Sequence, residues 1–459
     1  MNVEEFIDKF QKVDFDFEGV NWWPLLKVQV AYQIHLKINA TPNFTKVNPY
    51  QHKKCKGISI KDEIKLYWLH YQKTTTCKNL VVTANHLNQP QGASNDFYNP
   101  FTDPFIHFFK KENISYLLYN VASNQQLMGY PIQLLKRKYE KKVRQAFDKN
   151  LEFQQQLKTL TTFLKTQYGQ DFDLYNHLVV NIINNQVEYW AYRTILKKAR
   201  VKNILLYCYY NNTMMAICRA AQRLNIKVIE YQHSQVTSNH FAYSNWSTIS
   251  SKSIGFFPAT IWVWRSSDAA YLQEQFFKLP ALQFVVGGNL NVEMVKRKNI
   301  KAESVNNTIK VLITLQGIQV PDFVMDVLSE IPNLIFYLRL HPRYPNDREW
   351  VVQMKQQYGN QIEIEEANSL DLYTLFNNVD FHLTNFSGSA IEADYFGVTN
   401  IIYGDKGYLT YKADIENKRY EFVNNTDDLK NSIINTRKYT TGKTRNDLNV
   451  SEIITGYFN

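Results

Sequence analysis

The stretch "VDFHLTNFSGSAIEADYFGVTNIIYG" (Val379–Gly404) indicates how the second half of this 459-residue chain folds. An apolar run ends at Thr384, and a short loop rich in Ser and Gly follows. A segment of helical period begins near Ser389, and a second apolar run starts at Thr399. A strand, a crossover helix and a further strand predict a parallel βαβ unit. Apolar runs without alternation indicate strands that are buried on both faces.

The same alternation continues on both sides of this stretch. Further strands are predicted at Lys310–Leu315, Asn333–Leu340 and Gln361–Glu365, with segments of helical period between them. Repeats of this kind predict a parallel sheet covered by helices on both faces. We therefore expect a Rossmann-like lobe over residues 279–459, with closing helices after Asp427.

The first half repeats the pattern less regularly. Strands are predicted at Asn79–Ala84, Ile114–Asn120, Asn203–Tyr210 and Lys227–Gln232, while residues from about 125 to 200 are polar and of helical period. The fold class expected for the whole chain is α/β, with two Rossmann-like lobes facing a central cleft. The N-terminal lobe covers residues 1–278 and carries the helical stretch as an added layer.

Composition bounds the class of protein. A hydrophobic content of 44% and a charged content of 20% are typical of a globular chain. No apolar run reaches the roughly 18 residues that span a bilayer. The acidic start "MNVEEFIDKF" lacks the order of a signal peptide. The four cysteines show no metal-binding spacing, so we expect reduced thiols and a cytoplasmic protein.

The net charge of +10 is concentrated in two segments. Residues 136–149 contain seven basic and two acidic residues, and residues 193–202 contain five basic residues and no acidic one. Such segments attract phosphates or anionic lipid surfaces, or they are solvated helix faces. No nucleic-acid-binding module is recognisable, so nucleic acid is not an expected partner.

The loop "NFSGS" (Asn385–Ser389) has two interpretations. It follows a strand and opens a helix, where backbone N–H groups, the Ser387 and Ser389 hydroxyls and the bare backbone of Gly388 suit a phosphate. Glu392, one turn further on, suits a ribose hydroxyl. The alternative is a capping box, because Ser389 and Glu392 have the spacing S-x-x-E.

Two other loops follow strands of the same predicted sheet. In "LRLHPRY", the residues His341, Pro342 and Arg343 begin the loop after one strand. Pro342 holds His341 extended, and a His and an Arg there suit a diphosphate. After another strand, Gln316 and Gly317 form a third loop. Loops after parallel strands share one edge of the sheet, so these residues are predicted to form one nucleotide-binding site.

In the N-terminal half, three residues are candidates for a general base. His233 opens the polar loop that follows the strand ending near Gln232. Asp96 and Asp103 lie in the long loop Thr83–Phe105, which follows the first clear strand. Each type of side chain serves as a base when its pKa and position suit. Residue type and position do not rank the three.

A resemblance adds to this interpretation. The chain resembles bacterial capsular and surface-polysaccharide glycosyltransferases of the GT-B fold, which typically read Ile-Glu-Leu-Gln-His-Gly where this chain has "IEYQHS", with Ser234 in place of the glycine. The segments that carry the resemblance, in order, are "FEGVNWWPLLKVQVAYQI", "FYNPFTDPF", "VIEYQHS", "HFAYS", "FFPATIWVW", "VVGG", "KVLITLQG", "LRLHP" and the opening stretch.

The resemblance implies particular roles. Its His-Pro pair and downstream serines are similar to enzymes that use cytidine-nucleotide donors, which implies that His341, Ser387 and Ser389 contact the donor phosphates and that Glu392 binds ribose. Retaining enzymes of this fold carry a second glutamate seven residues before the ribose-binding one. Asn385 stands there in this chain, which favours inverting chemistry.

The expected activity is an inverting glycosyl transfer from a nucleotide-sugar, with the cytidine nucleotide favoured, to a surface polysaccharide or lipid-linked glycan. Neither a metal ion nor a cofactor is expected, because positive groups and backbone N–H groups stabilise the leaving phosphate. The basic segments and "NWWPLL" (Asn21–Leu26) suit peripheral contact with an anionic inner membrane face. The alternatives are a CDP-glycerol- or CDP-ribitol-type phosphotransferase, a sugar-nucleotide epimerase, or a non-catalytic binding protein.

Overall fold

The computed structural model of the chain forms two compact units. The first contains Met1–Gly288 and Asn449–Asn459, and the second contains Asn289–Leu448. The described residues are 3–38, 58–71, 76–84, 89–90, 97–122, 126–237, 240–246, 248–296, 308–341, 347–436 and 448–459. The two units are described in turn.

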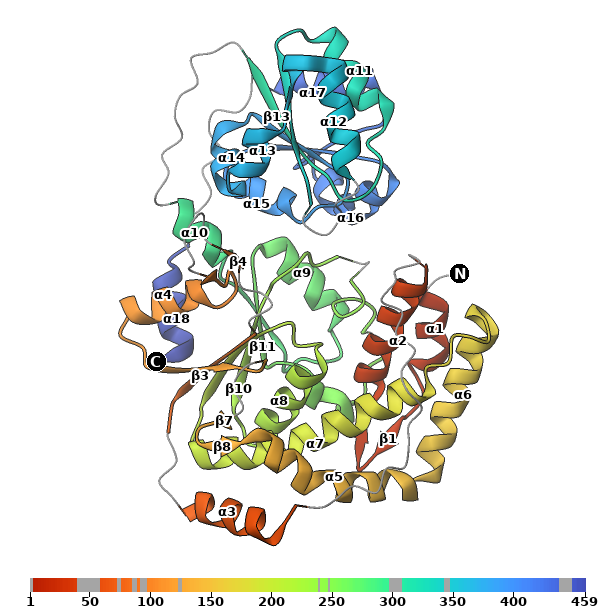
Figure 1. The fold of residues 1–459 in the computed structure, drawn as a ribbon, viewed down its shortest axis with the longest axis vertical. Helices are drawn as coiled ribbons and strands as arrows, with labels where there is room; N and C mark the ends of the chain where they lie inside the picture. Colours follow the sequence, from red (N-terminus) through yellow and green to blue (C-terminus); the bar gives the residue numbers. More distant parts are fainter. Residues whose placement is uncertain are drawn as a thin grey trace. The chain divides into compact units, whose positions relative to one another are not determined.

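The first unit is built on a six-stranded parallel sheet with the order β12-β11-β10-β9-β3-β6 (Figure 1). Its central strands are apolar and fully buried, because helices cover both faces. The sheet strands are β3 (Asn79–Thr83), β6 (Tyr116–Asn120), β9 (Asn203–Tyr207), β10 (Lys227–Tyr231), β11 (Thr260–Val263) and β12 (Gln283–Val286). Three two-stranded antiparallel pairs flank it: β1 (Asp16–Phe17) with β2 (Val20–Asn21), β4 (Gln89–Pro90) with β5 (Phe97–Tyr98), and β7 (Gln126–Leu127) with β8 (Tyr130–Pro131).

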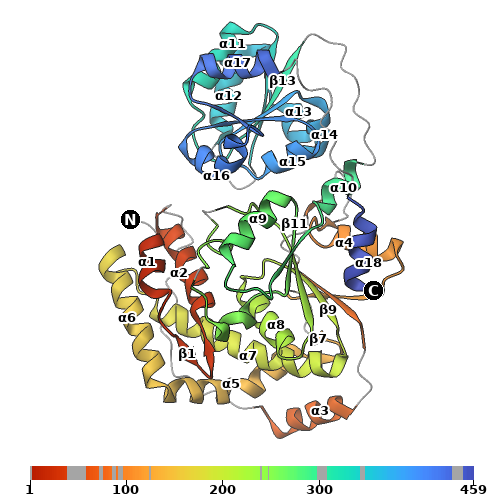
Figure 2. The ribbon, with the colours of Figure 1, turned by 180° about the vertical axis from the view of Figure 1, so that it is seen from behind.

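The helices of the first unit include the expected added layer. Of the three long helices α5, α6 and α7, the pair α5 and α7 pack together at one end of the unit, and α6 runs along its side beside α1 (Figures 1 and 2). The helices are α1 (Val3–Phe10), α2 (Trp23–Ile38), α3 (Ile60–Tyr71), α4 (Asp103–Lys111), α5 (Ile132–Lys149), α6 (Leu151–Tyr168), α7 (Tyr175–Ala199), α8 (Asn212–Gln222), a 3₁₀ helix (Ser251–Phe256), α9 (Ser266–Gln275) and α18 (Val450–Phe458).

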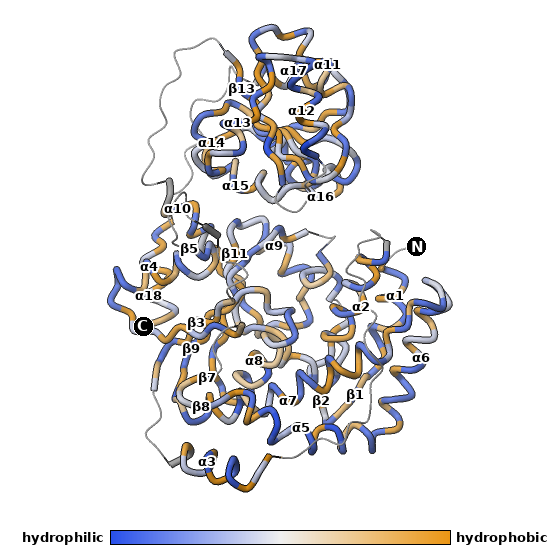
Figure 3. The backbone as a smooth tube through the Cα atoms, viewed as in Figure 1, coloured by the Kyte–Doolittle hydropathy of each residue, from blue (hydrophilic) through white to orange (hydrophobic). Residues whose placement is uncertain are grey.

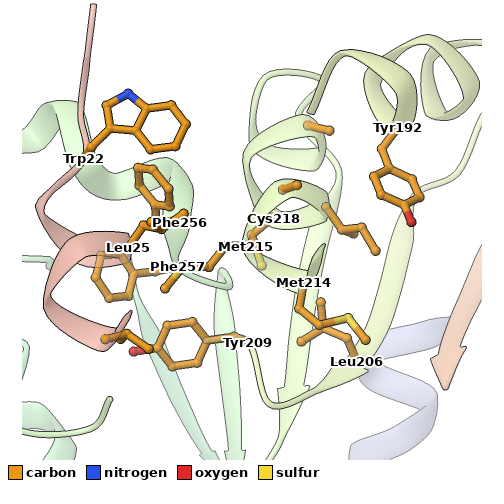
Figure 4. Packing of buried hydrophobic residues seen from close by; sticks show 14 of the residues in the cluster. Trp22, Leu25, Tyr192, Leu206, Tyr209, Met214, Met215, Cys218, Phe256 and Phe257 are labelled. Atoms are coloured by element: carbon orange, nitrogen blue, oxygen red, sulfur yellow. The ribbon is translucent and has the colours of Figure 1, made fainter. Parts of the chain in front are cut away.

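The segment "NWWPLL" belongs to the core of the first unit. Trp22, Leu25 and Leu26 have no exposed surface, and Trp23 is 3% exposed. Figure 4 shows Trp22 and Leu25 beside the rings of Phe256 and Phe257. The expectation that this segment contacts a membrane is wrong, because burying its aromatic and aliphatic surface stabilises the fold. Among the described residues, no helix has both the length and the apolar content needed to cross a bilayer.

The second unit is also a six-stranded parallel sheet, with the order β15-β14-β13-β16-β17-β18. Figure 3 shows hydrophobic residues concentrated in its strands, whereas the outer helix α6 of the first unit is mainly hydrophilic. The strands are β13 (Ile309–Thr314), β14 (Leu334–Arg339), β15 (Ile362–Glu363), β16 (Phe381–Thr384), β17 (Thr399–Tyr403) and β18 (Glu421–Val423). The helices are α10 (Leu290–Lys296), α11 (Asp322–Glu330), α12 (Asp347–Tyr358), a 3₁₀ helix (Gly359–Gln361), α13 (Glu365–Ser369), α14 (Leu372–Asn378), α15 (Ser389–Tyr395), α16 (Asp405–Glu416) and α17 (Thr426–Thr436).

The α/β class and the two Rossmann-like lobes are confirmed, and the units depart from the expected boundaries in two places. The first unit extends to Gly288 because β12 pairs with β11 in register from Thr260 with Gln283. The last helix, α18, belongs to the first unit, since Phe458 packs edge-on to Phe109 with ring centroids 4.8 Å apart. Of the closing helices expected in the second lobe, α17 is there and α18 is not.

Candidate functional site

The strand order of the second unit places a topological switch point between β13 and β16. From these two neighbouring strands the chain continues to opposite sides of the sheet, β13 toward β14 and β16 toward β17. The loops that follow them therefore separate at the carboxyl edge, where ligands bind in doubly wound sheets. A hydrogen bond joins the two loops, because the Phe386 N–H donates to Gln316 Oε1 at 3.0 Å. Gln316 thus lies where the sequence predicted a binding loop.

A buried polar network supports this edge from below. His382 of β16 is fully buried, and its Nδ1 lies 2.8 Å from Asn400 Oδ1. The Asn400 amide nitrogen donates to the Ala390 carbonyl, so Oδ1 faces the histidine and Nδ1 carries the proton. Nε2 is then an acceptor and lies 3.0 Å from the Thr314 hydroxyl and 3.2 Å from the Ser389 hydroxyl. Burial lowers the pKa of His382 to about 4, so the ring is neutral at pH 7.

Ser389 takes part in this network and not in a capping box. Its hydroxyl contacts Thr314 at 3.2 Å and donates to Ser387 Oγ at 2.7 Å, and only 7% of the residue is exposed. The N-cap of α15 is Gly388, which has no side chain to accept a hydrogen bond. The capping-box interpretation is therefore wrong. Tertiary contacts from β13 and β16 hold the Ser389 hydroxyl instead.

Ser387 and Gly388 occupy the accessible part of the loop. Both are half-buried, and Ser387 Oγ accepts from the hydroxyl and, at 3.4 Å, from the N–H of Ser389. The Ser387 carbonyl accepts a hydrogen bond from the Tyr411 hydroxyl of α16. The loop is thus held at its backbone and at one hydroxyl, while Gly388 presents no side chain.

Glu392 lies one turn into α15, where it is partly buried. Its carboxylate accepts a hydrogen bond from the Tyr373 hydroxyl at 2.7 Å. The same hydroxyl accepts from the Asn291 side chain at 2.5 Å. Burial raises the pKa of the Glu392 carboxyl. Its carboxylate is thus held by α14, and its role toward a ribose stays a prediction.

The other two predicted loops, which contain Gln316–Gly317 and His341, leave the same edge of the sheet. The Gly317 N–H donates to the Asp347 carboxylate at 2.9 Å, and its φ of +70° is one that glycine adopts readily. His341 follows β14, whose last residue, Arg339, accepts a hydrogen bond from Leu315 N–H. His341 and Gln316 thus leave adjoining strands. Pro342 and Arg343 lie outside the described residues.

Two features of this edge were not found from the sequence. The Asn385 side chain is 8% exposed, and its Oδ1 has no hydrogen-bond partner among the described residues. Lys406, which follows β17, places Nζ 3.6 Å from the centre of the Phe386 ring. The signal for both is the pattern already used for "NFSGS": polar residues directly after a buried strand. Applied to "TNIIYGDKG", it would have selected Lys406.

Glycines let the loops after β16 and β17 approach closely. A Cβ on Gly407 would lie 2.5 Å from the Asn385 carbonyl oxygen, and one on Gly404 would lie 2.8 Å from the Asn385 amide nitrogen. Gly404 also has a φ of +74°. Only glycine fits the first position without displacing backbone, so the "GDKG" segment is shaped to hold Asn385 in place.

The carboxyl edge of the first sheet carries a different set of buried polar groups. Glu230 of β10 is fully buried and accepts from the Tyr209 N–H at 3.1 Å and from the Tyr243 hydroxyl at 2.8 Å. Burial raises the pKa of this carboxyl to about 8, so it is largely protonated at pH 7. Its second oxygen has no hydrogen-bond partner among the described residues.

Beside Glu230, Tyr210 links His233 to a second histidine, His240. The Tyr210 hydroxyl lies 2.9 Å from His233 Nε2 and 3.2 Å from His240 Nε2. Burial lowers the pKa of His233 to about 3 and that of His240 to about 4, so both rings are neutral. The two Nδ1 atoms are buried and have no partner among the described residues.

The Tyr210 hydroxyl has one proton, and this determines how the tautomers of His233 and His240 are related. It goes to one Nε2, and the other Nε2 must then carry a proton and donate it to the tyrosine oxygen. Since each neutral imidazole has one N–H, one of the two Nδ1 atoms is an acceptor and the other is a donor. The sequence singled out His233 but gave no role to Tyr210.

Asp103 lies near this cluster. It opens α4 and accepts from the Asn99 N–H at 2.7 Å, and burial raises its pKa. The Asn99 side chain binds Thr83 at the end of β3, and the Phe101 ring meets the His233 ring edge-on at 5.9 Å. The structure thus brings Asp103 and His233 to one edge of the sheet. Asp96 lies outside the described residues.

Comparisons with known proteins support the fold. The chain matches no protein-family model and no curated protein. Among solved structures, it is similar to a putative UDP-N-acetylglucosamine 2-epimerase from Listeria monocytogenes, with 12% identity and a TM-score of 0.51 over 83% of this chain and 95% of the other. It is also similar to the UDP-GlcNAc 2-epimerase of Neisseria meningitidis bound to UDP-GlcNAc, with 15% identity and a TM-score of 0.50 over 83% and 99%. Its fold is therefore of the two-lobed GT-B type.

Proposed function

We propose that the second unit binds a nucleotide-sugar and that the chain is an inverting glycosyltransferase. The proposed acceptor is a surface polysaccharide or a lipid-linked glycan, and the reaction needs no metal ion or bound cofactor. The observation that carries the proposal is the pair of loops at the crevice between β13 and β16, joined by the Gln316–Phe386 hydrogen bond. Nucleotides bind at this position in doubly wound sheets.

The proposed donor contacts follow from the groups at this edge. The Gly317 N–H already holds a carboxylate, that of Asp347, and the same donor suits a phosphate oxygen. Ser387 and Gly388 lie on the neighbouring loop, and Lys406 supplies a positive charge that stabilises the departing phosphate. His341 completes the phosphate contacts from the β14 side. The Asn385 Oδ1 is a buried acceptor suited to an N–H or hydroxyl of the donor.

In the first unit, the proposed base is His233 acting through Tyr210. A neutral Nδ1 accepts the proton of the acceptor hydroxyl. The His233 Nε2–H moves to the tyrosine oxygen, and the tyrosine proton moves to His240 Nε2. Burial opposes a charged imidazole, as the lowered pKa values of both histidines indicate. After the relay the extra proton, and with it the positive charge, is on His240, whose buried imidazole must release its Nδ1 proton to become neutral again. Asp96 and Asp103 remain alternative bases.

Binding of the donor is tested by thermal unfolding with CMP, CDP, UDP and GDP. We expect the melting temperature to rise with one nucleotide class, because a ligand that binds the folded state stabilises it. The solved structure from Neisseria meningitidis contains UDP-GlcNAc, whereas the sequence resemblance favours cytidine, so both belong in the screen. The Gly407→Ala variant serves as the site control, since it displaces the Asn385 loop. A protein that none of the four nucleotides stabilises would contradict the proposal.

The relay is tested with Tyr210→Phe, His233→Ala and Asp103→Asn, assayed by nucleotide release with acceptor present. If His233 is the base, its loss lowers kcat by roughly 100-fold or more, and Tyr210→Phe gives a smaller loss. An Asp103→Asn variant that is as inactive as His233→Ala would move the role to Asp103.

The second candidate is sugar-nucleotide epimerisation, which the two similar structures favour. Incubation with UDP-GlcNAc without any acceptor separates the two, because an epimerase converts the donor by itself and a transferase does not. Proton NMR of the sugar reports the product. Incubation with CDP-glycerol or CDP-ribitol tests the phosphotransferase alternative. Stabilisation by a nucleotide-sugar without any turnover would identify a non-catalytic binding protein.

A further inference from the structure

The helix α3 of the first unit has two apolar faces, of which only one is buried. Leu66 is 5% exposed, Leu69 packs against the core, and the Tyr130 hydroxyl donates to the Leu69 carbonyl at 3.4 Å. The opposite face points to solvent. Four large side chains occupy it at helical spacing, with exposed fractions of 78% for Ile60, 52% for Ile64, 62% for Tyr67 and 64% for Trp68.

This exposed row is too large to be incidental. Single exposed apolar residues are normal on a protein surface, but a contiguous set on one helix face marks an interaction site. The row lies opposite the face that fixes the helix, so it contributes nothing to the packing of α3. No other described helix has four large side chains of this kind exposed on one face.

Basic residues occur on α3 itself and where the strands of the first sheet begin. Lys61 and Lys65 of α3 are exposed. The chain then enters the sheet at Lys78, whose carbonyl accepts from Lys202 N–H at 2.9 Å, and the Lys202 carbonyl accepts from Lys227 N–H at 2.9 Å. Lysines thus stand at the starts of three neighbouring strands, and Lys78 and Lys202 are exposed.

Two further helices extend the positive charge. At the end of α7, Lys197 and Arg200 are exposed just before β9. The helix α5 begins directly after Tyr130-Pro131 of β8, the strand that touches α3, and it exposes Arg137, Lys138, Lys141 and Lys142. Both views of the ribbon show α3 and α5 at the same end of the unit (Figures 1 and 2).

We propose that the exposed face of α3, together with these basic residues, docks the protein on an anionic lipid bilayer. Helices that lie in the bilayer surface place Trp, Tyr and aliphatic side chains among the acyl chains and use Lys and Arg to attract the headgroups. Each basic residue near an anionic surface adds to the attraction. This surface is independent of the proposed nucleotide-sugar site.

The shape of the surface favours a bilayer over a protein partner. A stable protein interface buries about 1,000 Å² or more with complementary packing. The α3 row is the face of a single helix, and a helix face is convex. A bilayer needs no matching shape, because the headgroup region adapts to a helix lying flat.

The proposal is tested by flotation of the full chain with vesicles of phosphatidylcholine alone and of phosphatidylcholine mixed equally with phosphatidylglycerol. We expect flotation with the anionic vesicles only, weakening as salt is raised. A double variant, Ile64→Ser with Trp68→Ser, should bind about tenfold more weakly or not at all, because it removes the inserted surface. The matched control is Leu151→Ser on α6, where 73% of the leucine is exposed, and it should bind like the unaltered protein.

Three results would overturn the proposal. The first is that the unaltered protein fails to float with anionic vesicles or floats equally with neutral ones. The second is that the double variant binds as well as the Leu151→Ser control while its melting temperature is unchanged. The third is a dimer in solution that the double variant dissociates, which would assign the row to a second copy of the chain.

Discussion

The carboxyl edges of the two sheets differ in how their buried polar groups are satisfied. In the second unit, both ring nitrogens of His382 have partners, and the Thr314 hydroxyl is hydrogen-bonded to those of Thr384 and Ser389. In the first unit, one oxygen of Glu230 and the Nδ1 atoms of two histidines have none among the described residues. The His382 network is closed, although Asn385 Oδ1 in the loop above it lacks a partner among the described residues, whereas in the first unit the atoms without partners belong to the buried cluster itself.

This difference separates two ways of building a site. A closed network fixes the loops above it, so ligand binding there depends on backbone shape, glycines and the few side chains that the loops present. Buried groups without partners carry a desolvation cost that a ligand or water relieves, and such groups are typical of proton transfer. This difference is the basis for proposing donor binding at the edge of the second unit and proton transfer at the edge of the first.

The largest expected effect is on the closed network itself. The change His382→Ala leaves Asn400 and one hydroxyl buried without partners, so the second unit should lose roughly 3 kcal/mol of unfolding free energy. Hydrogen exchange of peptides covering β13, β16 and β17 measures the loss. The control is Thr410→Ala on α16, a partly exposed residue whose loss should change stability by less than about 0.5 kcal/mol. Equal protection in both variants would show that the network does not fix this edge.

The next largest effect is a pH dependence of the stability of the first unit. Because burial raises the pKa of Glu230 to about 8, the folded state keeps its proton where the unfolded state has lost it. The contribution to stability is full below the unfolded pKa of about 4.5 and falls as pH rises through 8.

Between pH 6.5 and 8.5 the unaltered protein should lose roughly 2 kcal/mol of unfolding free energy through this group. A Glu230→Gln variant lacks the titration and should show a much flatter profile, measured by urea unfolding at several pH values. The histidines of both edges, with pKa values of about 3 to 4, act in the opposite direction and only below pH 6.5. If the unfolding free energy of Glu230→Gln fell with pH as steeply as that of the unaltered protein, Glu230 would not be the group that titrates.

A smaller effect tests whether backbone shape governs the donor edge. In Gly407→Ala the new methyl group would meet the Asn385 carbonyl at 2.5 Å and displace the loop, so nucleotide affinity should fall about tenfold. Isothermal titration calorimetry measures it. The control is Gly456→Ala in α18. A Cβ at this position would have no heavy atom within 4 Å, so the affinity for the nucleotide should not change. Unchanged affinity in the first variant would place the nucleotide elsewhere.

The smallest effect is expected at Ser387. Its hydroxyl is half-buried and lies at the accessible end of the network, so Ser387→Ala should cost less than about 1 kcal/mol of stability. Nucleotide affinity should fall a few-fold through the lost contact. A variant that loses stability but keeps its affinity would show that this serine only supports the loop.

Most of the sheet strands could be predicted from the sequence, because buried parallel strands are apolar without alternation. The nine predicted strands all occur within one or two residues of the expected bounds or are shortened at their ends. The strands β11, β12 and β18 were missed. The first follows Pro258 in an aromatic stretch, β12 lies where the domain boundary was expected, and β18 has three residues. Such segments become strands through pairing with a neighbour, which local pattern does not report.

The common edge of the predicted site residues could be derived from the sequence, and their contacts could not. The rule that ligands meet the carboxyl ends of strands selected Gln316, His341 and Ser387, and these lie at one edge. The capping box failed because the Ser389 hydroxyl meets Thr314 and His382, residues on other elements. Local spacing gives no information on such contacts. The burial of "NWWPLL" escaped prediction for the same reason, since an aromatic cluster suits a core and a surface equally.

The position of α18 has a consequence for how the protein is made. This helix packs on α4, and its Phe458 carbonyl accepts a hydrogen bond from Asn79 of β3, a strand from the opposite end of the chain. During synthesis the second unit has all its residues before this helix leaves the ribosome. The first unit therefore cannot be completed until α18 has been made. Before that, the rings of Phe105 and Phe109 lack their contacts with Phe458, and removal of α18 should lower the yield of native protein.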